Sequence, residues 1–406
     1  MNAMPQAQTL ETEVIIIGGG IVGASAALFL RRKNIPVILL ESNVCGARAS
    51  GVNYGGVRRQ GRGLAQMALT QRAHEIWGDL RGLIGTDGEY VRSGHLKLAR
   101  NSTDMDALEA YRLQTLGAGM HLQLLDTTAL RSRYPWVGTA AVGASFCPED
   151  GHANPRVVSP AFARAAQAAG AQIHEHARVT SATHDGQHFT VTTAHGLTIR
   201  SPYLLNCAGA WAGAFASSFG EAVPEISIHP LMMVTEPLPL FMTVSTGIQG
   251  GSIYARQVAR GNCVIGGGRG LRSNDDLARP AGQGISLLLS RAALLFPQLQ
   301  GANVIRFWTG VEGEMPDHNP VLGPSAKVPG LLHGFGFCGA GFQIGPAAGE
   351  VLAELVAHGT SRIRLDAFDI KRFLPVQSAP NDSQPTPTRP DIDTTKAVST
   401  QLELSR

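Results

Sequence analysis

A glycine-rich turn between an apolar strand and a helix constrains the fold of this chain more than any other feature. Residues 14–17 are apolar and lead into the sequence G-G-G-I-V-G at 18–23, which a helical pattern follows over residues 24–33. A second apolar segment, residues 36–40, ends directly before Glu41. A strand, this glycine spacing, a helix and an acid after the next strand are the signature of a Rossmann-type βαβ unit that binds a dinucleotide.

Each glycine of this motif has a physical purpose in dinucleotide binding. Gly18 permits the tight turn, Gly20 lets the backbone approach a pyrophosphate, and Gly23 lets the helix pack closely on the strand. The start of the helix offers free N–H groups to the phosphates. Glu41 is expected to accept hydrogen bonds from the adenosine ribose hydroxyls and, as an acid, to disfavour the 2′-phosphate of NADP. A glycine-rich turn without a ligand is the alternative, and the strand, helix and acid in register argue against it.

Length and composition indicate a large globular protein with two or three folding units. The net charge of +3, from 34 basic and 31 acidic residues, gives no argument for binding nucleic acid or an anionic membrane surface. The five cysteines are widely spaced and never form a C-x-x-C pair, so neither a disulfide framework nor a metal site is expected. Without an apolar run of about 18 residues or a secretory signal pattern, a cytoplasmic protein with no membrane span is expected.

The rest of the chain alternates helical and strand patterns, with a Gly- and Arg-rich loop over residues 48–62. Helices are predicted over residues 64–84, 103–116, 155–170, 284–296 and 342–357. Strands are predicted over residues 172–173, 189–193, 203–206, 232–235, 252–254, 263–265 and 331–337. The end of the chain, residues 374–406, is rich in Pro, Thr, Ser and Asp, which predicts a disordered tail.

Three segments of the chain resemble the D-amino-acid oxidase/sarcosine oxidase family of FAD-dependent amine oxidoreductases. They are residues 48–62, 206–211 and 308–343. The most specific blocks are W-T-G-V-E-G-E-M-P-D-H-N-P-V-L-G-P at 308–324 and H-G-F-G-F-C-G-A-G-F-Q-I-G-P at 333–346, and the resemblance extends over residues 12–373. Within the family, the chain is most similar to the β-type subunits of bacterial opine oxidases and sarcosine oxidases. The resemblance implies FAD as the cofactor.

The resemblance also implies an α/β fold of the glutathione-reductase-like FAD type. A Rossmann-like FAD-binding domain is expected to be interleaved with an antiparallel-sheet substrate domain, and the active site is expected at their junction. The FAD-binding domain is predicted from residues 12–80, 150–220 and 305–373. The substrate-binding domain is predicted from residues 81–149 and 221–304.

Several later segments are implied to contact the cofactor. The segment A-S-G-V-N-Y-G-G at 49–56 lies along the flavin in such proteins, and Val179 falls where a backbone contact to adenine is usual. N-C-A-G-A-W at 206–211 matches a turn near the phosphates and ribose. G-A-G-F-Q at 339–343 caps the last helix, whose N–H groups can stabilise negative charge on the reduced flavin. Ordinary turn and cap roles are the alternative for each of these later glycines.

The motif and the resemblance together give one set of predicted cofactor contacts. They are Gly18, Gly20, Ile21, Val22, Gly23, Glu41, Ser42, Arg48, Ala49, Ser50, Asn53, Gly55, Gly56, Val179, Ala208, Gly209, Trp211, Gly310, Gly339, Ala340, Gly341, Phe342 and Gln343. No metal ligand is predicted.

Arg58 is the predicted anchor for a substrate carboxylate. In N-Y-G-G-V-R at 53–58 it matches the arginine of sarcosine-oxidase-type motifs, and a guanidinium fits a carboxylate as a planar fork. A surface position or pairing with a structural acid is the alternative for Arg58. Arg59 and Arg62 are adjacent competitors for the same role.

Four more residues are secondary candidates for the catalytic site: Tyr54, Tyr254, Arg256 and Glu312. Tyr254 and Arg256 alternate on one strand, so both can face a cavity; core packing or a surface ion pair is the alternative. Glu312 falls where many relatives carry a carboxylate-binding arginine. An acid at this position favours a substrate with a basic side chain, or holds Arg58 in place.

Three departures from the sarcosine oxidase pattern bear on the chemistry. Gly310 falls where monomeric enzymes have the cysteine that bonds to FAD, so non-covalent FAD is predicted. Ala340 and Gln343 replace a histidine and a lysine near the flavin, so the substrate is expected to differ from sarcosine. Val264 falls where an oxygen-activating lysine is expected, which favours a dehydrogenase, since a cation there stabilises developing superoxide.

The expected function is FAD-dependent oxidation of the C–N bond of an amino acid by hydride transfer. The predicted substrate is a secondary amine such as an opine, an N-alkyl amino acid or a cyclic imino acid. This reaction requires an oriented C–H bond and a neutral amine rather than a nucleophile. A primary D-amino acid or glycine oxidase is one alternative. A flavin-bearing subunit that is active only with a redox partner in a hetero-oligomer is another, and a non-catalytic nucleotide sensor is the least supported.

Overall fold

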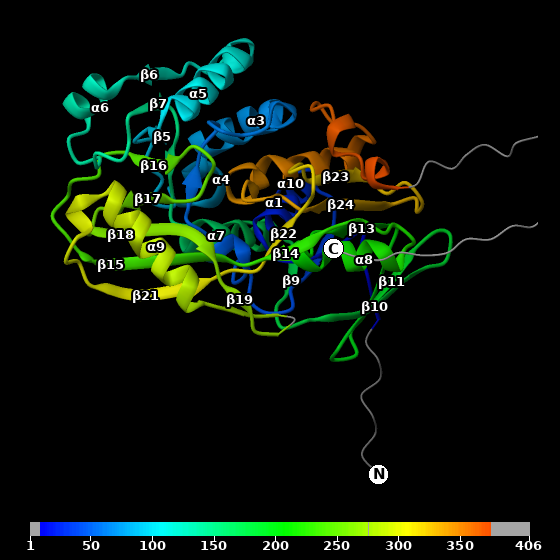
Figure 1. Ribbon diagram of the computed structural model, residues 1–406. Helices are drawn as coiled ribbons and strands as arrows, with labels where there is room; N and C mark the ends of the chain where they lie inside the picture. Colours follow the sequence, from blue (N-terminus) through cyan, green and yellow to red (C-terminus); the bar gives the residue numbers. More distant parts are fainter. Residues whose placement is uncertain (1–8, 275, 375–406) are drawn as a thin grey trace, which may run out of the picture. The chain divides into compact units, whose positions relative to one another are not determined.

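Two large sheets of different construction organise the chain (Figure 1). The computed structural model describes residues 9–274 and 276–374, which belong to one compact unit. The tail predicted from residue 374 lies outside the described residues except for Leu374 itself.

The first large sheet has six short strands built around the glycine-rich turn. In spatial order they are β23 (Val321–Pro324), β24 (Leu331–Phe335), β13 (Tyr203–Asn206), β2 (Val14–Ile17), β3 (Val37–Leu40) and β9 (Gln172–His174). All neighbours are parallel except β23 and β24. The central strands β2 and β3 are runs of Val, Ile and Leu, buried along their whole length. Such runs are typical of parallel strands covered on both faces.

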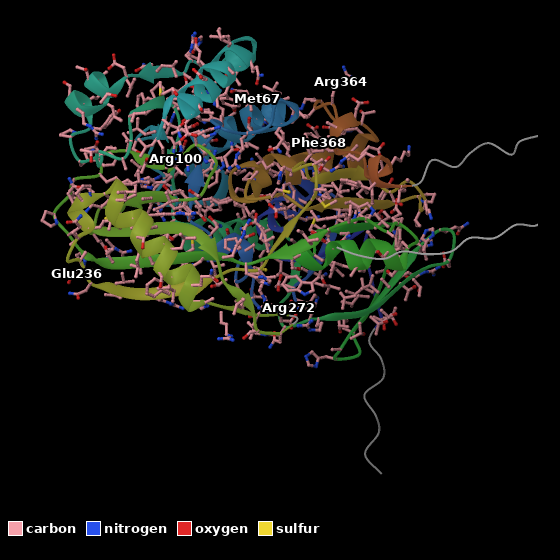
Figure 2. All side chains as sticks on the ribbon, viewed as in Figure 1. Met67, Arg100, Glu236, Arg272, Arg364 and Phe368 are labelled. Atoms are coloured by element: carbon pink, nitrogen blue, oxygen red, sulfur yellow. The ribbon has the colours of Figure 1, made fainter. Side chains whose placement is uncertain are left out.

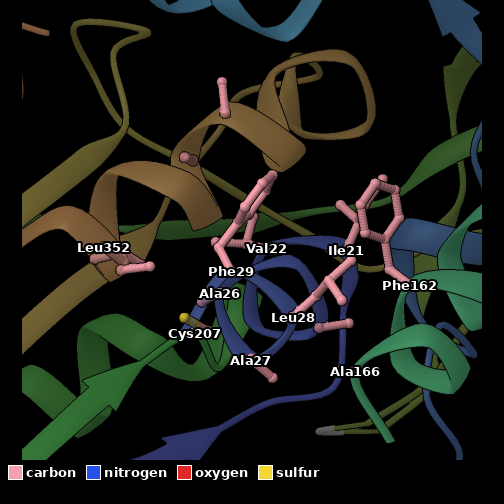
Figure 3. Packing of buried hydrophobic residues seen from close by; sticks show 14 of the residues in the cluster. Ile21, Val22, Ala26, Ala27, Leu28, Phe29, Phe162, Ala166, Cys207 and Leu352 are labelled. Atoms are coloured by element: carbon pink, nitrogen blue, oxygen red, sulfur yellow. The ribbon is translucent and has the colours of Figure 1, made fainter. Parts of the chain in front are cut away.

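Helices cover one face of this sheet. They are α1 (Ile21–Arg32), α7 (Pro155–Ala168) and α10 (Gly341–His358), and α1 packs against both of the others. Figure 3 shows α1 between Phe162 of α7 and Leu352 of α10. α10 also packs on α3 (Met67–Gly78). This packing fixes the starts of α1 and α10 close to the ends of the parallel strands.

A smaller sheet covers the opposite face. Its strands are β1 (Thr9–Glu11), β12 (Thr198–Ser201), β11 (Phe189–Thr193) and β10 (Val179–His184), in that order. Phe189 and Ile199 from this sheet pack with Ile15, Ile38 and Leu204 of the six-stranded sheet. The alternate residues of β2 and β3 pack with the helices, because successive side chains of a strand point to opposite faces.

The second large sheet has eight strands and is mostly antiparallel. In order they are β21 (Val304–Thr309), β15 (Pro230–Pro237), β18 (Asn262–Arg269), β17 (Tyr254–Gln257), β16 (Ser245–Ile248), β5 (His95–Ala99), β7 (Gly143–Cys147) and β6 (Gln123–Leu125). Only the β16–β5 pair is parallel. Helix α9 (Gly282–Leu295) packs on β18, and its Leu288 and Ala292 lie in the core of this layer.

The remaining helices and strands lie between these elements along the chain. The helices are α2 (Ala49–Val52), α4 (Leu80–Ile84), α5 (Ser102–Thr115), α6 (Thr127–Arg133) and α8 (Ala212–Ser218). The strands are β4 (Gly56–Val57), β8 (Gly151–His152), β14 (Ile226–Ile228), β19 (Leu271–Arg272), β20 (Ala278–Arg279) and β22 (Glu312–Glu314). Single 3-10 turns span Leu64–Gln66, Leu116–Ala118, Gly209–Trp211, Pro297–Leu299, Asp366–Phe368 and Ile370–Phe373. Pairing of β4 with β8 ties the loop at 48–62 to the segment before α7.

Several predicted elements differ from the structure. The helix predicted over residues 64–84 is three pieces, because the chain leaves the helical conformation at Asp79. The loop predicted at 48–62 contains α2 and β4. The strand predicted at 252–254 begins at its last residue and continues as β17. Strands β5, β7 and β6 were not predicted, and they lie together at one end of the eight-stranded sheet.

The two large sheets draw on different parts of the chain. The six-stranded sheet uses strands within residues 14–40, 172–206 and 321–335, and the eight-stranded sheet uses strands within residues 95–147 and 230–309. The domain limits themselves stay a prediction. Within the described residues, the helices are too short or too polar to cross a membrane.

Charged side chains at the outer edge of the described chain are paired or solvated. Figure 2 labels Arg364 and Glu236 at this edge. Arg364 Nε lies 3.2 Å from Asp366 Oδ2, and both side chains are more than three-quarters exposed (92% and 77%). Pairs of this kind contribute little to stability. The charged side chains inside the molecule differ from these in their burial and in their partners.

Candidate active site

A cavity of about 770 Å³ runs between the glycine-rich turn and the eight-stranded sheet. Its wall is formed by the ends of β2, β3 and β13, the segment 48–62, strands β5, β17 and β22, and the start of α10. The volume lies within the usual range of ligand pockets. Residues far apart in the sequence therefore meet around one elongated site.

The glycine-rich turn leaves no room for side chains. Gly18 has φ +106°, and a Cβ on it would lie 2.2 Å from the carbonyl oxygen of Cys207. A Cβ on Gly20 would meet Ser50 Oγ at 3.0 Å, and one on Gly23 would meet the Gly18 carbonyl oxygen at 2.0 Å. Gly18 and Gly20 line the cavity, whereas Gly23 packs α1 on the turn. A ligand in the cavity can therefore touch the backbone itself.

Glu41 stands at the end of β3 and lines the same part of the cavity. Its Oε2 accepts the Gly19 N–H at 2.7 Å, and its Oε1 accepts the Asn43 N–H at 2.8 Å. The Ser42 hydroxyl donates to Oε1 at 3.1 Å. The acid thus fixes the turn and keeps acceptor capacity on both oxygens, because a carboxylate oxygen accepts more than one hydrogen bond.

The segment after Glu41, residues 48–56, forms the floor of the cavity between the end at the glycine-rich turn and the opposite end. Ser50 Oγ accepts the N–H of Ile21 at 2.9 Å, at the first residue of α1. Asn53 folds its amide back on the carbonyls of α2 and accepts the Gly55 N–H at 2.7 Å. The Arg48 guanidinium lies 5.8 Å from the centroid of the Trp211 ring. These contacts hold the segment 48–56, which includes α2, along the cavity wall.

Most of the predicted cofactor residues line this cavity, and four do not: Gly23, Gly310, Ala340 and Gln343. Gln343 is fully buried and donates from Nε2 to the Thr70 carbonyl at 3.0 Å, so its side chain points to α3. Ala340 is buried at the start of α10, and a Cβ on Gly310 would meet Val52 Cγ2 at 3.2 Å. The glycine motif placed Gly23 in the predicted set, and the family resemblance placed the other three. In the structure all four lie outside the cavity lining.

The residues present fit an elongated dinucleotide such as FAD. A backbone cradle without Cβ atoms lies at the N-terminus of α1, with an acid at the end of β3 and a floor made of residues 48–56. Val179, Ala208, Gly209 and Trp211 line the same end of the cavity. The helix N-terminus favours anionic phosphates, and the acid favours hydroxyl donors.

The other end of the cavity is cationic. Arg58, Arg62 and Lys97 line it together with His95 and Tyr254. The Arg58 Nη1 donates to the Gln60 carbonyl, and the Arg62 Nη1 donates to the Gly339 carbonyl at 3.2 Å. Among the described residues, no carboxylate lies within ion-pair distance of Arg58, Arg62 or Lys97.

Burial and mutual repulsion perturb these cations. Burial, then the nearby Arg58, lowers the pKa of Arg62 to about 9. The same two causes, with Arg62, lower the pKa of Lys97 to about 8. Depressed pKa values in a cleft are typical of functional sites, where a ligand supplies the missing charge.

His95 is neutral at the wall of this end. Burial first, then Arg58 and Lys97, holds the pKa of its imidazole well below the ordinary value. Ser245 Oγ donates to the Gly94 carbonyl at 3.0 Å, so it accepts from His95 Nδ1 at 3.1 Å. This hydrogen-bond pattern assigns the proton to Nδ1 and leaves Nε2 as an acceptor. His95 Nε2 lies 3.5 Å from the Cβ position of Gly247, which also lines the cavity.

The predicted catalytic residues are only partly brought together. Arg58, Tyr54, Tyr254 and Glu312 line the cavity, and Arg256 does not. Arg256 is buried behind Tyr54, where Nε donates to the Tyr54 carbonyl at 2.8 Å. Its Nη1 lies 3.2 Å from Nδ1 of His152. The prediction of a cavity-facing Arg256 is therefore corrected: β17 alternates as expected, but Tyr54 fills the space before the guanidinium.

Tyr54 and Tyr254 differ in what their hydroxyls do. Tyr54 Oη donates to the Ala255 carbonyl at 2.7 Å, which commits it to the scaffold. Within residues 9–274 and 276–374, the Met232 sulfur at 3.7 Å is the only acceptor for Tyr254 Oη. The rings meet edge to face, with centroids 4.9 Å apart. The Tyr254 hydroxyl is therefore the one available to a ligand.

Glu312 does not hold Arg58 in place. Its Oε1 accepts the N–H of Gly339 at the start of α10, and burial raises its pKa. Arg269, Arg62 and Glu314 are the charges that act on it. Of the two roles predicted for Glu312, the positioning of Arg58 is thus not supported by a contact.

The sequence reasoning missed His95 and Lys97. Both lie on β5, whose sequence H-L-K-L-A buries Leu96 and Leu98 in the core and turns the alternate residues to the cavity. The alternation was a usable signal for a strand. Arg59, a predicted competitor of Arg58, is buried against Glu149 and does not line the cavity, whereas Arg62 does.

Val264 lies outside the cavity. It sits on β18, paired with Val234 of β15 and Arg256 of β17. Its identity therefore says little about the groups near a bound cofactor. The lysine that the structure does bring to the cavity is Lys97.

Comparisons with known proteins agree with this geometry. The family described as FAD dependent oxidoreductase matches residues 13–355. One of the opine oxidase subunits of Rhizobium meliloti is 29% identical over 89% of this chain and 98% of its own length. Glycine oxidase of Geobacillus kaustophilus is 28% identical over 89% of this chain and 97% of its own length. The human mitochondrial sarcosine dehydrogenase is 27% identical over 89% of this chain and 41% of its own.

Solved structures show the same fold. Crystalline glycine oxidase from Geobacillus kaustophilus superposes with a TM-score of 0.83 at 24% identity, over 90% of this chain and all of the other. L-proline dehydrogenase from P. horikoshii gives the same TM-score and identity, over 90% of this chain and 98% of the other. With a family match over most of its length and a cavity fitted to a dinucleotide, this chain belongs to the family of FAD-dependent oxidoreductases that act on amines and amino acids.

Proposed function

We propose that this chain oxidises the C–N bond of an amino acid that is a secondary amine, such as an opine, an N-alkyl amino acid or a cyclic imino acid. The observation that carries the proposal is the cationic end of the cavity, where Arg58, Arg62 and Lys97 face a space continuous with the glycine-rich turn. Cations without a counterion suit a substrate carboxylate. We further propose that the six-stranded layer forms the FAD-binding domain and the eight-stranded layer the substrate domain.

The protein groups bind and orient the substrate. Arg58 presents its guanidinium to the carboxylate, which fixes the amino acid by a forked contact. Tyr254 Oη and the acceptor Nε2 of His95 are the uncommitted polar groups for the amine. Bound FAD supplies the acceptor for the hydride that leaves the carbon next to nitrogen. The main task of the site is to orient the C–H bond of the substrate towards that acceptor.

The same cations favour the reactive form of the amine. Hydride transfer needs the nitrogen lone pair, so the amine must lose its proton. Positive charges within a few ångströms disfavour the ammonium form and lower its pKa. Burial first, and then the neighbouring cations, lowers the pKa of Arg62 and of Lys97 at this end of the cavity, and the same two causes would act on an ammonium there.

The relatives support oxidation of an amine. Their names include opine oxidase, sarcosine dehydrogenase and 4-methylaminobutanoate oxidase, each of which names a substituted amine. Glycine oxidase names a primary amine, so a primary amino acid or glycine oxidase is the alternative that the substrate panel must separate. A second candidate is a flavin-bearing subunit that needs a partner, since two relatives are each named as one subunit of an opine oxidase.

The sequence favours a dehydrogenase over an oxidase. That expectation depended on Val264, which lies outside the cavity, and Lys97 places a cation inside it. A cation beside the flavin favours reaction with oxygen. A separate arm of the experiment therefore tests whether oxygen or another compound accepts the electrons.

The first test is anaerobic bleaching of the flavin absorbance of the purified holoenzyme by a panel of amines. The panel holds opines, sarcosine, proline derivatives, glycine and D-amino acids. Rapid bleaching by a secondary amine supports the proposal, and bleaching only by glycine or a primary D-amino acid overturns it. Air is then admitted: fast reoxidation with peroxide makes the enzyme an oxidase, and slow reoxidation makes it a dehydrogenase.

A parallel test addresses the partner. The tagged chain is purified from its native host, and the co-purifying proteins are analysed. If bleaching occurs only when a co-purified protein is present, the hetero-oligomer candidate is supported. If the isolated chain turns over at the same rate, that candidate fails.

A further inference from the structure

Glu312 brings a carboxylate to the place where the floor of the cavity meets the start of α10. It is the first residue of β22, and it lines the cavity. The floor, residues 48–56, runs into β4, and β4 packs against α10. The first turn of α10 contains no acidic residue of its own. The anion that complements this helix start therefore comes from a separate strand.

The Glu312 carboxylate is bound to the backbone of the turn before α10. Its Oε1 accepts the N–H of Gly339, a residue with φ +75° that also lines the cavity. On the other side of this peptide, Arg62 Nη1 donates to the Gly339 carbonyl at 3.2 Å. Within residues 9–274 and 276–374, the Gly339 N–H is the only hydrogen-bond donor to the Glu312 side chain. The carboxylate is thus held in place and keeps capacity for a proton.

Charged and titratable groups face Glu312 from several elements. They are Arg62 after β4, Arg269 at the end of β18, Tyr254 on β17, Glu314 on β22 and Cys338 before α10. Among the described residues, no basic side chain lies within ion-pair distance of Glu312. Burial, the largest influence, raises the pKa of Glu312, whereas the Gly339 N–H and the two arginines lower it. A further charge nearby can therefore change its protonation state.

Bound FAD would bring such a charge to this point. Its phosphates suit the start of α1, and the remainder of the molecule then follows residues 48–56 towards β4 and the start of α10. A hydride carries two electrons and one proton, so its transfer adds one negative charge to the flavin. A negative charge raises the pKa of a neighbouring carboxylate.

We propose that Glu312 takes up a proton from the solvent when the bound flavin is reduced. The carboxylate becomes a neutral carboxyl group, and the electron pair stays on the flavin, so this part of the cavity gains no net negative charge. The coupling is reciprocal: an ionised Glu312 disfavours reduction by the factor by which reduction favours its protonation. The inference requires bound FAD but no particular amine, so it goes beyond the proposed function.

The test counts the protons taken up per two electrons when the FAD-loaded enzyme is reduced at an electrode. In the wild type we expect a pH window, between about pH 5 and pH 9, with one proton more than in Glu312→Gln. The glutamine keeps an oxygen for the Gly339 N–H but cannot take up the proton. Above the window, Glu312→Gln should raise the ratio of reduced to oxidised flavin at a fixed potential about tenfold, the factor for one unit of pKa. Equal proton counts at every pH overturn the inference.

Infrared difference spectra of the reduced and the oxidised enzyme locate the extra proton. A carboxyl C=O band that appears on reduction and is absent in Glu312→Gln supports the inference. The same band in both proteins assigns the proton to another acid and overturns it. Two protons per two electrons in both proteins, with the absorbance of neutral reduced flavin, place the proton on the flavin and also overturn it. If Glu312→Gln fails to retain FAD, the wild-type spectra decide, because the inference requires the band.

Glu314→Gln is the matched control. Glu314 lies on the same strand and lines the same cavity, but its Oε2 has Arg269 Nη2 at 4.0 Å. This variant should keep the extra proton, and its loss here but not in Glu312→Gln overturns the assignment. Equal flavin content and a cooperative melting transition show that each variant is folded.

The electrode supplies the electrons, so this result does not depend on the panel of amines. If no amine bleaches the flavin while Glu312→Gln loses the extra proton, the proposed function fails and the role of Glu312 stands. If a secondary amine bleaches the flavin while the two proteins take up equal numbers of protons, only the role of Glu312 fails.

Discussion

The two ends of the cavity are built on opposite principles. At the cofactor end, contacts come from the backbone of one continuous βαβ unit, and the acid Glu41 accepts hydrogen bonds from its own turn. At the cationic end, contacts come from side chains of separate segments, and Arg58 and Lys97 have no acid partner among the described residues. The first end is satisfied without a ligand, whereas the cations of the second lack an acid within ion-pair distance among the described residues and gain a close counter-charge from a bound anion.

This difference shows why the two ends respond to different changes. A backbone cradle no longer fits its ligand when a Cβ is added, because its binding depends on the shape of the backbone. A charge cluster fails when a charge is removed, and its removal also relieves repulsion in the free protein. Function and stability are therefore expected to diverge at the cationic end and to fall together at the cofactor end.

The largest effect is expected for Gly18→Ala, at the centre of the cradle. The new Cβ would meet the Cys207 carbonyl at 2.2 Å in a backbone conformation with φ +106°. We expect bound FAD per chain to fall about tenfold or more, since a loss of 1.4 kcal/mol already gives that factor. The measurement is the ratio of flavin to protein absorbance. In the control, Gly78→Ala, nothing lies within 4 Å of the new Cβ, so FAD content should stay unchanged.

The next largest effect is expected at Glu221, a buried acid outside the cavity lining. Glu221 is fully buried and accepts from His333 Nε2 at 2.9 Å, Ser325 Oγ at 2.7 Å and the Ala326 N–H at 2.6 Å. Glu221→Ala leaves one buried donor, His333 Nε2, and two half-buried donors without this acceptor, so the free energy of unfolding should fall by about 1–3 kcal/mol. Denaturant unfolding of the holoenzyme measures it. Glu221→Gln, which keeps an acceptor oxygen, should lose less; an equal loss in both variants would contradict this account.

Lys97→Met should stabilise the substrate-free holoenzyme at pH 7 by a few degrees in Tm. Burial, with Arg58 and Arg62, lowers the pKa of Lys97 in the folded chain from 10.5 to about 8, against a partial opposing effect of Asp104. Between pH 8 and 10.5 the unfolded chain therefore holds the proton that the folded chain has lost, and the wild type gains stability as pH rises. Below pH 8 both states are protonated, and the folded wild type carries the full repulsion.

The Tm difference between Lys97→Met and the wild type should accordingly shrink between pH 7 and pH 9.5. Thermal melts at several pH values test this directly. A variant that is less stable than the wild type at pH 7 would show that Lys97 has a favourable structural contact, which would weaken the contrast between the two ends.

The smallest effect is expected for Tyr54→Phe. It removes the hydrogen bond from Tyr54 Oη to the Ala255 carbonyl, which costs about 0.5–1.5 kcal/mol of stability. Because this hydroxyl is committed to the scaffold, the rate of flavin bleaching should change less than in Tyr254→Phe. Comparing the two variants under anaerobic conditions tests which tyrosine faces the substrate. A larger rate loss in Tyr54→Phe would reverse the assignment.

The sequence determined the cofactor end by itself. Strand, glycine spacing, helix and acid all fall within residues 14–41, and short-range backbone geometry fixes how such a unit binds a dinucleotide. The strands β2, β3, β13 and β24 were predicted for the same reason, because each is a compact apolar run. The family blocks at 308–324 and 333–346 placed the later cofactor segments on the same cavity.

Only the tertiary structure decided the substrate end. Lys97 and His95 line the cavity because one face of β5 is turned towards it. The sequence around Arg58 does not predict that a strand almost forty residues later contributes to the same site. Arg256 was a secondary candidate, with core packing as its alternative, and the structure buries it behind Tyr54. Which side chain reaches a site depends on how separate segments pack, and that packing depends on the whole chain rather than on any one segment.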